Sequence, residues 1–129
     1  MKRVIPLLLL SILLLTGCTS PAPQANTYRQ VTAQEAADMM ARESGYVILD
    51  VRSQQEYATG HIPGAILIPN ENIGSNEIPE LPDKNQLIMV YCRSGNRSRQ
   101  AAEKLVRLGY TNVVEFGGVG TWTGELTKD

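Results

Sequence analysis

A cysteine in a short basic segment is the feature of this sequence best suited to chemistry. Cys92 follows the apolar run at residues 87–91 and precedes the small and basic run RSGNRS at 93–98, where a helical pattern begins. The start of a helix presents unpaired N–H groups and a partial positive charge, and Arg93 and Arg97 add full charges. Each of these favours a thiolate, so we expect a lowered pKa for Cys92 and a nucleophilic side chain.

The spacing within this segment indicates which class of reaction the cysteine could catalyse. Four residues separate Cys92 from Arg97. Protein tyrosine phosphatases use a similar loop with one residue more between cysteine and arginine, and that longer loop forms a ring of N–H groups wide enough for a phosphate. The shorter loop should hold one sulfur atom bonded to the cysteine better than a phosphoryl group. The spacing therefore favours sulfur transfer, with a phosphatase or arsenate reductase as the alternative enzyme class.

Three separated segments carry a resemblance to a known family. They are CRSGNRS at 92–98; LDVR at 49–52 with EY at 56–57 and GHIPGA at 60–65; and FGG at 116–118 followed by Trp122. In this order they resemble the active-site loop, upstream signature and closing loop of single-domain rhodaneses, the thiosulfate sulfurtransferases. The resemblance covers about residues 28–126, nearly the whole of the chain that would remain after removal of the signal.

The resemblance implies a fold and a reaction. The expected fold is α/β, a single rhodanese-like domain over residues 28–129 with a parallel sheet flanked by helices. Cys92 would take a sulfane sulfur from thiosulfate or a similar donor and pass it, as a persulfide, to a thiol or cyanide acceptor, without a cofactor. The substrate would be bound by the rest of the loop: Arg93, Ser94, Gly95, Asn96, Arg97 and Ser98. A non-catalytic rhodanese-like lipoprotein that binds a partner or a small anion is the main alternative, and a thiol redox role is disfavoured because the domain has no second cysteine.

Three polar residues of the upstream segment are candidates for the site. Asp50 could act as a base and His61 as an acid; alternatively, the charges of Asp50 and Arg52 could pair while His61 forms a hydrogen bond to the turn. A thiolate that its loop already stabilises needs no general base. We therefore expect these three side chains to be structural supports.

Strands and helices alternate around these residues. Apolar runs predict strands at 46–51, 65–68, 87–91 and 113–116, and capping boxes predict helices that begin after Thr32 and Ser53. A further helix is expected over 96–108, and residues 70–85 should form a loop. This alternation predicts a parallel sheet, in which ligands lie at the carboxyl ends of the strands, where Cys92 falls.

The first residues predict export and lipidation. A basic start and an apolar run at 4–15, too short to span a bilayer, are typical of a secretory signal. The tetrad LTGC at 15–18 resembles the lipobox of bacterial lipoproteins. We therefore expect a signal peptide at 1–17, a lipidated Cys18 with a flexible tether over 18–27, and a protein anchored by lipid in the bacterial cell envelope, facing the periplasm or the exterior.

Composition and charge indicate whether the protein binds nucleic acid or a metal ion. Removing Lys2 and Arg3 with the signal leaves 10 basic against 13 acidic residues, a net charge of −3, and no basic tract is interleaved with aromatic residues. A nucleic-acid partner is therefore not expected. One histidine and one available cysteine are too few for a typical metal site, so no metal is expected either.

Overall fold

The computed structural model describes Gly17 and residues 27–129. The predicted signal peptide except Gly17, the lipidation site Cys18 and most of the predicted tether lie outside these residues. In the described part of the chain, no helix has both the length and the apolar character needed to cross a membrane.

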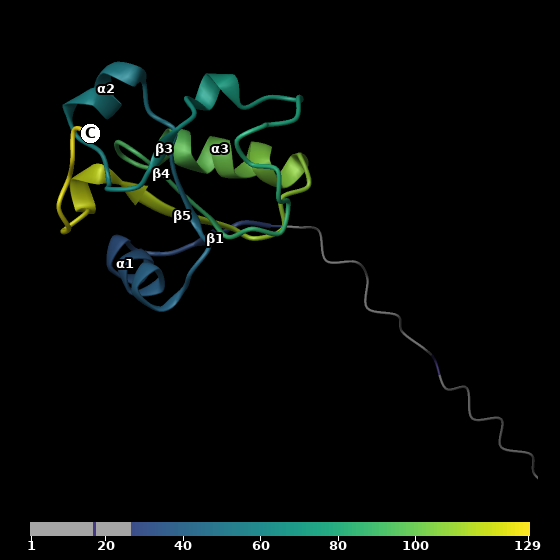
Figure 1. The fold of residues 1–129 in the computed structure, drawn as a ribbon. Helices are drawn as coiled ribbons and strands as arrows, with labels where there is room; N and C mark the ends of the chain where they lie inside the picture. Colours follow the sequence, from purple (N-terminus) through teal and green to yellow (C-terminus); the bar gives the residue numbers. More distant parts are fainter. Residues whose placement is uncertain (1–16, 18–26) are drawn as a thin grey trace, which may run out of the picture.

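Five parallel strands form one sheet in the order β1-β5-β4-β2-β3 (Figure 1). The strands are β1 (Arg29–Gln30), β2 (Val47–Asp50), β3 (Ile66–Leu67), β4 (Ile88–Cys92) and β5 (Val113–Gly118). The helices are α1 (Ala33–Arg42), α2 (Gln54–Thr59) and α3 (Asn96–Arg107), with single 3-10 turns η1 (Asn70–Asn72) and η2 (Val119–Thr121). The expected α/β fold with a parallel sheet flanked by helices is confirmed.

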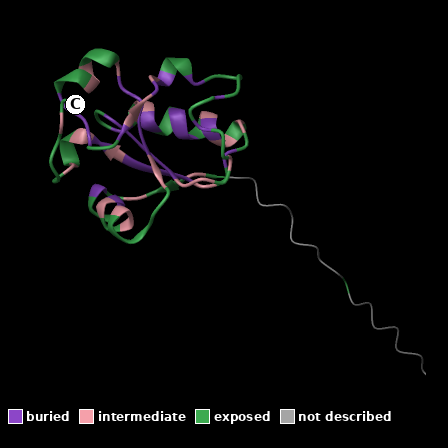
Figure 2. Ribbon diagram, in the orientation of Figure 1, coloured by how far each residue is buried: buried purple, intermediate pink, exposed green. Residues whose placement is uncertain are grey.

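Alternate residues of the central strands enter two cores on opposite faces of the sheet, as the period of a strand requires. On one face Leu49 and Val90 pack with Leu105 of α3, and on the other Ile48 and Met89 pack with α1. Figure 1 shows α1 and α3 on opposite sides of the sheet, and Figure 2 shows that the central strands β2, β4 and β5 and the inner side of α3 are largely buried. Cys92 therefore ends a strand that is covered on both faces.

The predicted capping boxes are present in both helices. Thr32 accepts a hydrogen bond from the N–H of Glu35 and Ser53 accepts one from the N–H of Glu56, and each glutamate side chain accepts one from the N–H of its cap residue. The helix expected over 96–108 is confirmed as α3. The interval 70–85 contains η1, and β1, an edge strand of two exposed residues, was not predicted.

Candidate active site

The loop around Cys92 is built from the end of β4 and the start of α3. Gly95 is the N-cap residue of α3 and has a φ of 106°, in the left-handed region that favours glycine. This conformation directs its N–H to Cys92, whose Sγ accepts the hydrogen bond at 3.0 Å. The turn after β4 thus wraps around the sulfur, as the apolar run and the following glycine predicted.

Hydrogen bonds and burial act on the Cys92 thiol in opposite directions. Burial raises its pKa, whereas hydrogen bonds from the Ser98 side chain and from the backbone N–H groups of Ser98, Gly95 and Ser94 lower it, and the result lies below the ordinary value of 9.0. The lowered pKa was predicted from the helix start and two arginines. The structure attributes it to the N–H groups and to Ser98, because the charges of Arg93 and Arg97 are not among its main causes.

Glu115 of β5 lies beneath the loop and was not identified from the sequence. Its carboxylate is buried, and Oε1 accepts hydrogen bonds from Ser98 Oγ at 2.6 Å and from the N–H of Gly117 at 2.8 Å. Ser98 Oγ in turn lies 3.4 Å from Cys92 Sγ. A carboxylate within a strand otherwise made of apolar residues was the available signal, since such a group is rarely buried without a partner.

A β-bulge brings β5 against the loop. Val90 pairs with Glu115 and Cys92 with Gly118, so β5 contains one residue more than β4 in this interval, and Gly117 takes a φ of 86°. A Cβ on Gly118 would lie 2.0 Å from the carbonyl oxygen of Arg93, which leaves room only for glycine. The Gly-Gly pair near the C-terminus therefore packs directly against the Cys92 loop.

The two arginines of the loop differ in their surroundings. Arg93 is exposed, as are Ser94 and Asn96. Arg97 is half-buried and donates from Nη1 and Nη2 to the carboxylate of Glu56, at 2.7 and 2.9 Å. Arg97 was predicted to bind an anionic donor, and in the structure its guanidinium is paired with Glu56 of α2.

Asp50 and Arg52 form a buried ion pair at the end of β2. Arg52 Nη2 lies 2.7 Å from Asp50 Oδ2 and also donates to the carbonyl of Gly60, at 2.8 Å. Tyr91 donates to the same Asp50 oxygen at 2.6 Å and accepts from the N–H of Ile62 at 3.1 Å. Burial, followed by the hydrogen bond to Asp50, raises the pKa of Tyr91. This network holds the residue before Cys92 and does not contact the sulfur.

His61 lies in the turn after α2. Its ring stacks on Tyr57, with centroids 3.6 Å apart, and Nδ1 lies 2.9 Å from the carbonyl oxygen of Tyr57. The backbone of His61 also pairs with that of Thr127. The contacts of His61 are therefore with α2, the turn after it and the C-terminal segment, and they suit the structural role expected for this residue.

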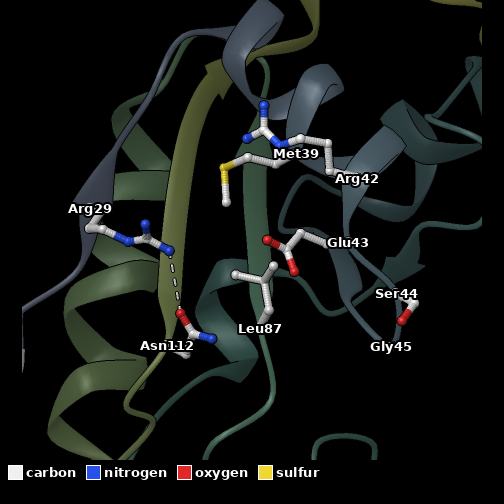
Figure 3. A pocket seen from close by; sticks show the side chains of 8 residues that line it. All are labelled: Arg29, Met39, Arg42, Glu43, Ser44, Gly45, Leu87 and Asn112. Atoms are coloured by element: carbon white, nitrogen blue, oxygen red, sulfur yellow. Dashed lines mark hydrogen bonds between the residues drawn. The ribbon is translucent and has the colours of Figure 1, made fainter.

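A groove borders the loop on the side of Arg93. It has a volume of about 410 Å³ and is lined by residues of α2, of the turn between β2 and α2, of the Cys92 loop and of η2: Arg52, Gln55, Glu56, Thr59, Arg93 and Val119. A second pocket, of about 370 Å³, lies between Arg29, Arg42 and Leu87 (Figure 3). Leu87 precedes β4, so this second pocket lies at the amino end of that strand, whereas Cys92 lies at its carboxyl end. The second pocket therefore takes no part in the site.

The described residues contain no group of three histidine, cysteine, aspartate or glutamate side chains that could hold a metal ion. The site itself contains a buried, hydrogen-bonded thiol beside basic and hydroxyl side chains. Such a thiol is a nucleophile toward a small electrophile that can enter the loop.

Known proteins are similar to this chain in sequence and in fold. The family model of the rhodanese-like domain matches residues 32–125. The thiosulfate sulfurtransferase PspE of Escherichia coli is 41% identical over 71 residues, which are 55% of this chain and 68% of PspE. The adenylyltransferase and sulfurtransferase UBA4 of Meyerozyma guilliermondii is 35% identical over 96 residues, 68% of this chain but only 22% of that longer protein. Among solved structures, a rhodanese with anions from E. coli is 36% identical with a TM-score of 0.60, covering 65% of this chain and 99% of that one.

Proposed function

The chain belongs to the rhodanese-like domain family, and from this premise we propose that it is a sulfurtransferase that carries a sulfane sulfur on Cys92. The relatives named as thiosulfate sulfurtransferases support the reaction class. The observation that carries the proposal is the N–H of Gly95 at 3.0 Å from Cys92 Sγ, within a loop that lowers the pKa of the thiol.

The transfer has two steps. The Cys92 thiolate attacks the outer sulfur of thiosulfate, an S–S bond forms to Cys92, and the S–S bond of the donor breaks with its electron pair leaving on sulfite. A thiol or cyanide then attacks the terminal sulfur of the persulfide and restores the thiolate. N–H groups that face the sulfur stabilise the negative charge of both the thiolate and the persulfide.

Access to Cys92 restricts the donor. Only 1% of the residue is exposed, so a donor has to present a narrow, terminal sulfur, as thiosulfate does. The groove beside Arg93 offers the anionic end of the donor a position next to an exposed guanidinium. These features favour a small anion with a protruding sulfur over a bulky aryl phosphate.

Intact mass spectrometry after brief thiosulfate treatment and desalting tests the proposal. Wild type should gain one sulfur atom, which cyanide or a thiol removes, and Cys92→Ser should gain none. A folded, reduced wild-type protein that gains no sulfur would refute the proposal. Hydrolysis of an aryl phosphate or reduction of arsenate by that protein would then point to the alternative enzyme classes.

We also propose that lipid on Cys18 anchors the domain in the cell envelope, with the domain facing the periplasm or the exterior. The support is the apolar run followed by LTGC at residues 15–18. When the full-length protein is expressed in bacteria that are fed a labelled fatty acid, wild type should incorporate the label and Cys18→Ser should not. Equal labelling of the two proteins, or no labelling of wild type, would refute the anchor without bearing on sulfur transfer.

A further inference from the structure

Three guanidinium groups lie in or beside the groove of the candidate active site, and two of them are already neutralised. Arg52 and Arg93 line the groove itself, and Arg97 lies in the first turn of α3. Asp50 pairs with Arg52, and Glu56, which also lines the groove, pairs with Arg97. Arg93 makes no ion pair within the described residues. The groove therefore offers a sulfur donor one uncompensated positive charge.

Glu56 acts on the sulfur site through Arg97. Its carboxylate accepts hydrogen bonds from Nη1 and Nη2 of Arg97, at 2.7 and 2.9 Å, so two short hydrogen bonds hold the guanidinium. The hydrogen bond to Glu56 raises the pKa of Arg97 against the effect of burial, and the negative charge of Cys92 contributes as well. Arg97 is thus close enough to the sulfur to attract an anion bound there, and Glu56 opposes that attraction.

The charge of a donor decides how strongly Glu56 opposes its approach. The interaction of a fixed charge with an ion is proportional to the charge of the ion, so a carboxylate at the groove repels a dianion twice as strongly as a monoanion. Thiosulfate carries two negative charges, whereas an alkyl thiosulfonate presents the same terminal sulfur with one. Both leave the same persulfide on Cys92: thiosulfate releases sulfite and methanethiosulfonate releases methanesulfinate, each with the electron pair of the broken S–S bond.

We propose that Glu56 sets the charge selectivity of the site, by disfavouring a dianionic sulfur donor relative to a donor with a single negative charge such as an alkyl thiosulfonate. The inference rests on the proposed sulfur transfer and names a specificity residue for it. Glu56 needs no contact with the reacting sulfur, because its charge acts on Arg97 and on the anionic end of the donor in the groove. Gln55 and Thr59, the other α2 residues of the groove, carry no charge that could replace it.

The remaining charged groups near the sulfur do not change this balance. Arg99 of α3 and Glu115 of β5 lie next to Gly95, where Arg99 Nη1 and Glu115 Oε1 are 3.3 and 3.9 Å from the position of a Cβ on that glycine. Their formal charges are opposite, and neither residue lines the groove. Arg93 therefore remains the one positive charge in excess.

The test compares two donors on the same full-length protein. Loading of Cys92 by low concentrations of thiosulfate or methanethiosulfonate is followed in single turnover by intact mass spectrometry. Glu56→Gln removes the charge but keeps an oxygen that can accept from Arg97, Glu56→Asp keeps the charge, and Glu103→Gln removes an exposed charge of α3 as a control. We expect Glu56→Gln to shift the ratio of the two rate constants roughly 3- to 10-fold toward thiosulfate, as for unit charges about 7 Å apart at a partly exposed site.

The ratio separates this role from a structural one, because a loosened loop would slow both donors alike. Glu56→Asp should stay closer to the wild-type ratio than Glu56→Gln, Glu103→Gln should match wild type, and Arg93→Gln should shift the ratio the other way. High salt should shrink each shift, because it screens exposed charges.

An unchanged ratio in a folded Glu56→Gln protein that still takes up sulfur, or a shift toward methanethiosulfonate, would overturn the inference and leave the proposed function standing. Failure of wild type to take sulfur from either donor would instead refute the proposed function, and the inference with it.

Discussion

Arg97 and Glu56 are joined by two short hydrogen bonds at the rim of the candidate site, at 2.7 and 2.9 Å. Glu56 lies in α2, which follows β2, and Arg97 lies in the first turn of α3, which follows Cys92. The pair therefore connects α2, which lines the groove beside Arg93, to the first turn of α3. It also leaves Arg93, which makes no ion pair within the described residues, as the more available charge of the loop.

The stability of the protein should depend on pH through Glu56. The hydrogen bond from Arg97, opposed by burial and aided by Ser53, lowers the pKa of Glu56 from 4.5 to about 2. A carboxyl group whose pKa is lower in the folded state stabilises the protein fully above its unfolded pKa, near 4.5, and this stabilisation is lost as pH falls toward 2. Glu56→Gln should therefore lower the free energy of unfolding at pH 7 by about 0.5–1 kcal/mol, as expected for a partly exposed pair.

Urea unfolding at pH 7 and at pH 3 measures this effect. The difference between wild type and Glu56→Gln should shrink at pH 3, whereas Glu103→Gln, an exposed control, should show no such convergence. A constant difference between wild type and Glu56→Gln at both pH values would show that the ion pair does not set the acid sensitivity.

Gly118→Ala should damage the site through sterics alone. The added Cβ would lie 2.0 Å from the carbonyl oxygen of Arg93, so the Cys92 loop or β5 has to shift. We expect a loss of about 1–3 kcal/mol in the free energy of unfolding and a slower alkylation of Cys92, because the N–H of Gly95 leaves its position near sulfur. Thermal unfolding and iodoacetamide kinetics report the two effects.

Gly120→Ala is the matched control for this substitution. Gly120 lies two residues further along, and its Cβ would meet nothing within 4 Å. Wild-type stability and alkylation are expected for it. If both variants behaved alike, the close packing of Gly118 against Arg93 would not be what holds the loop.

The parts of the fold that were predictable rest on local signals. The capping boxes at Thr32 and Ser53 and the apolar runs that became β2 and β4 are read within a few residues, and each formed as expected. The edge strand β1 was missed because its two residues are exposed and polar, and it exists only through pairing with β5.

Only the part of the site that is formed by residues close in sequence was predictable. Cys92 and Gly95, the glycine that turns the chain, are only three residues apart in sequence, so their relationship could be inferred. Glu115 meets Ser98 across 17 residues, and Glu56 meets Arg97 across 41, so neither contact follows from local pattern. Both depend on the sheet order that places β5 beside β4 and on the packing of α2 near the loop.

His61→Phe should retain sulfur transfer. A phenyl ring can keep the stacking on Tyr57, whose ring centroid is 3.6 Å away, but loses the contact of Nδ1 with the Tyr57 carbonyl oxygen. We expect a loss of about 1 kcal/mol in the free energy of unfolding and an undiminished yield of persulfide by intact mass spectrometry. A folded His61→Phe protein without persulfide would contradict the structural role of His61.

Tyr91→Phe tests whether the buried network before Cys92 supports the fold or the reaction. The Tyr91 hydroxyl donates to Asp50 Oδ2 at 2.6 Å and accepts from the N–H of Ile62 at 3.1 Å, so its removal leaves a buried N–H without a partner and weakens the solvation of a buried carboxylate. The expected loss in the free energy of unfolding is about 2–3 kcal/mol.

Tyr110→Phe is the matched control. Tyr110 is equally buried but donates only to the carbonyl of Leu81, so its replacement should lower the free energy of unfolding by about 1 kcal/mol. Persulfide formation should survive in both variants at a temperature where they are folded, because Tyr91 makes no contact with the sulfur. If Tyr91→Phe alone lost persulfide formation while folded, the network of Asp50, Arg52 and Tyr91 would have to act on Cys92 during transfer.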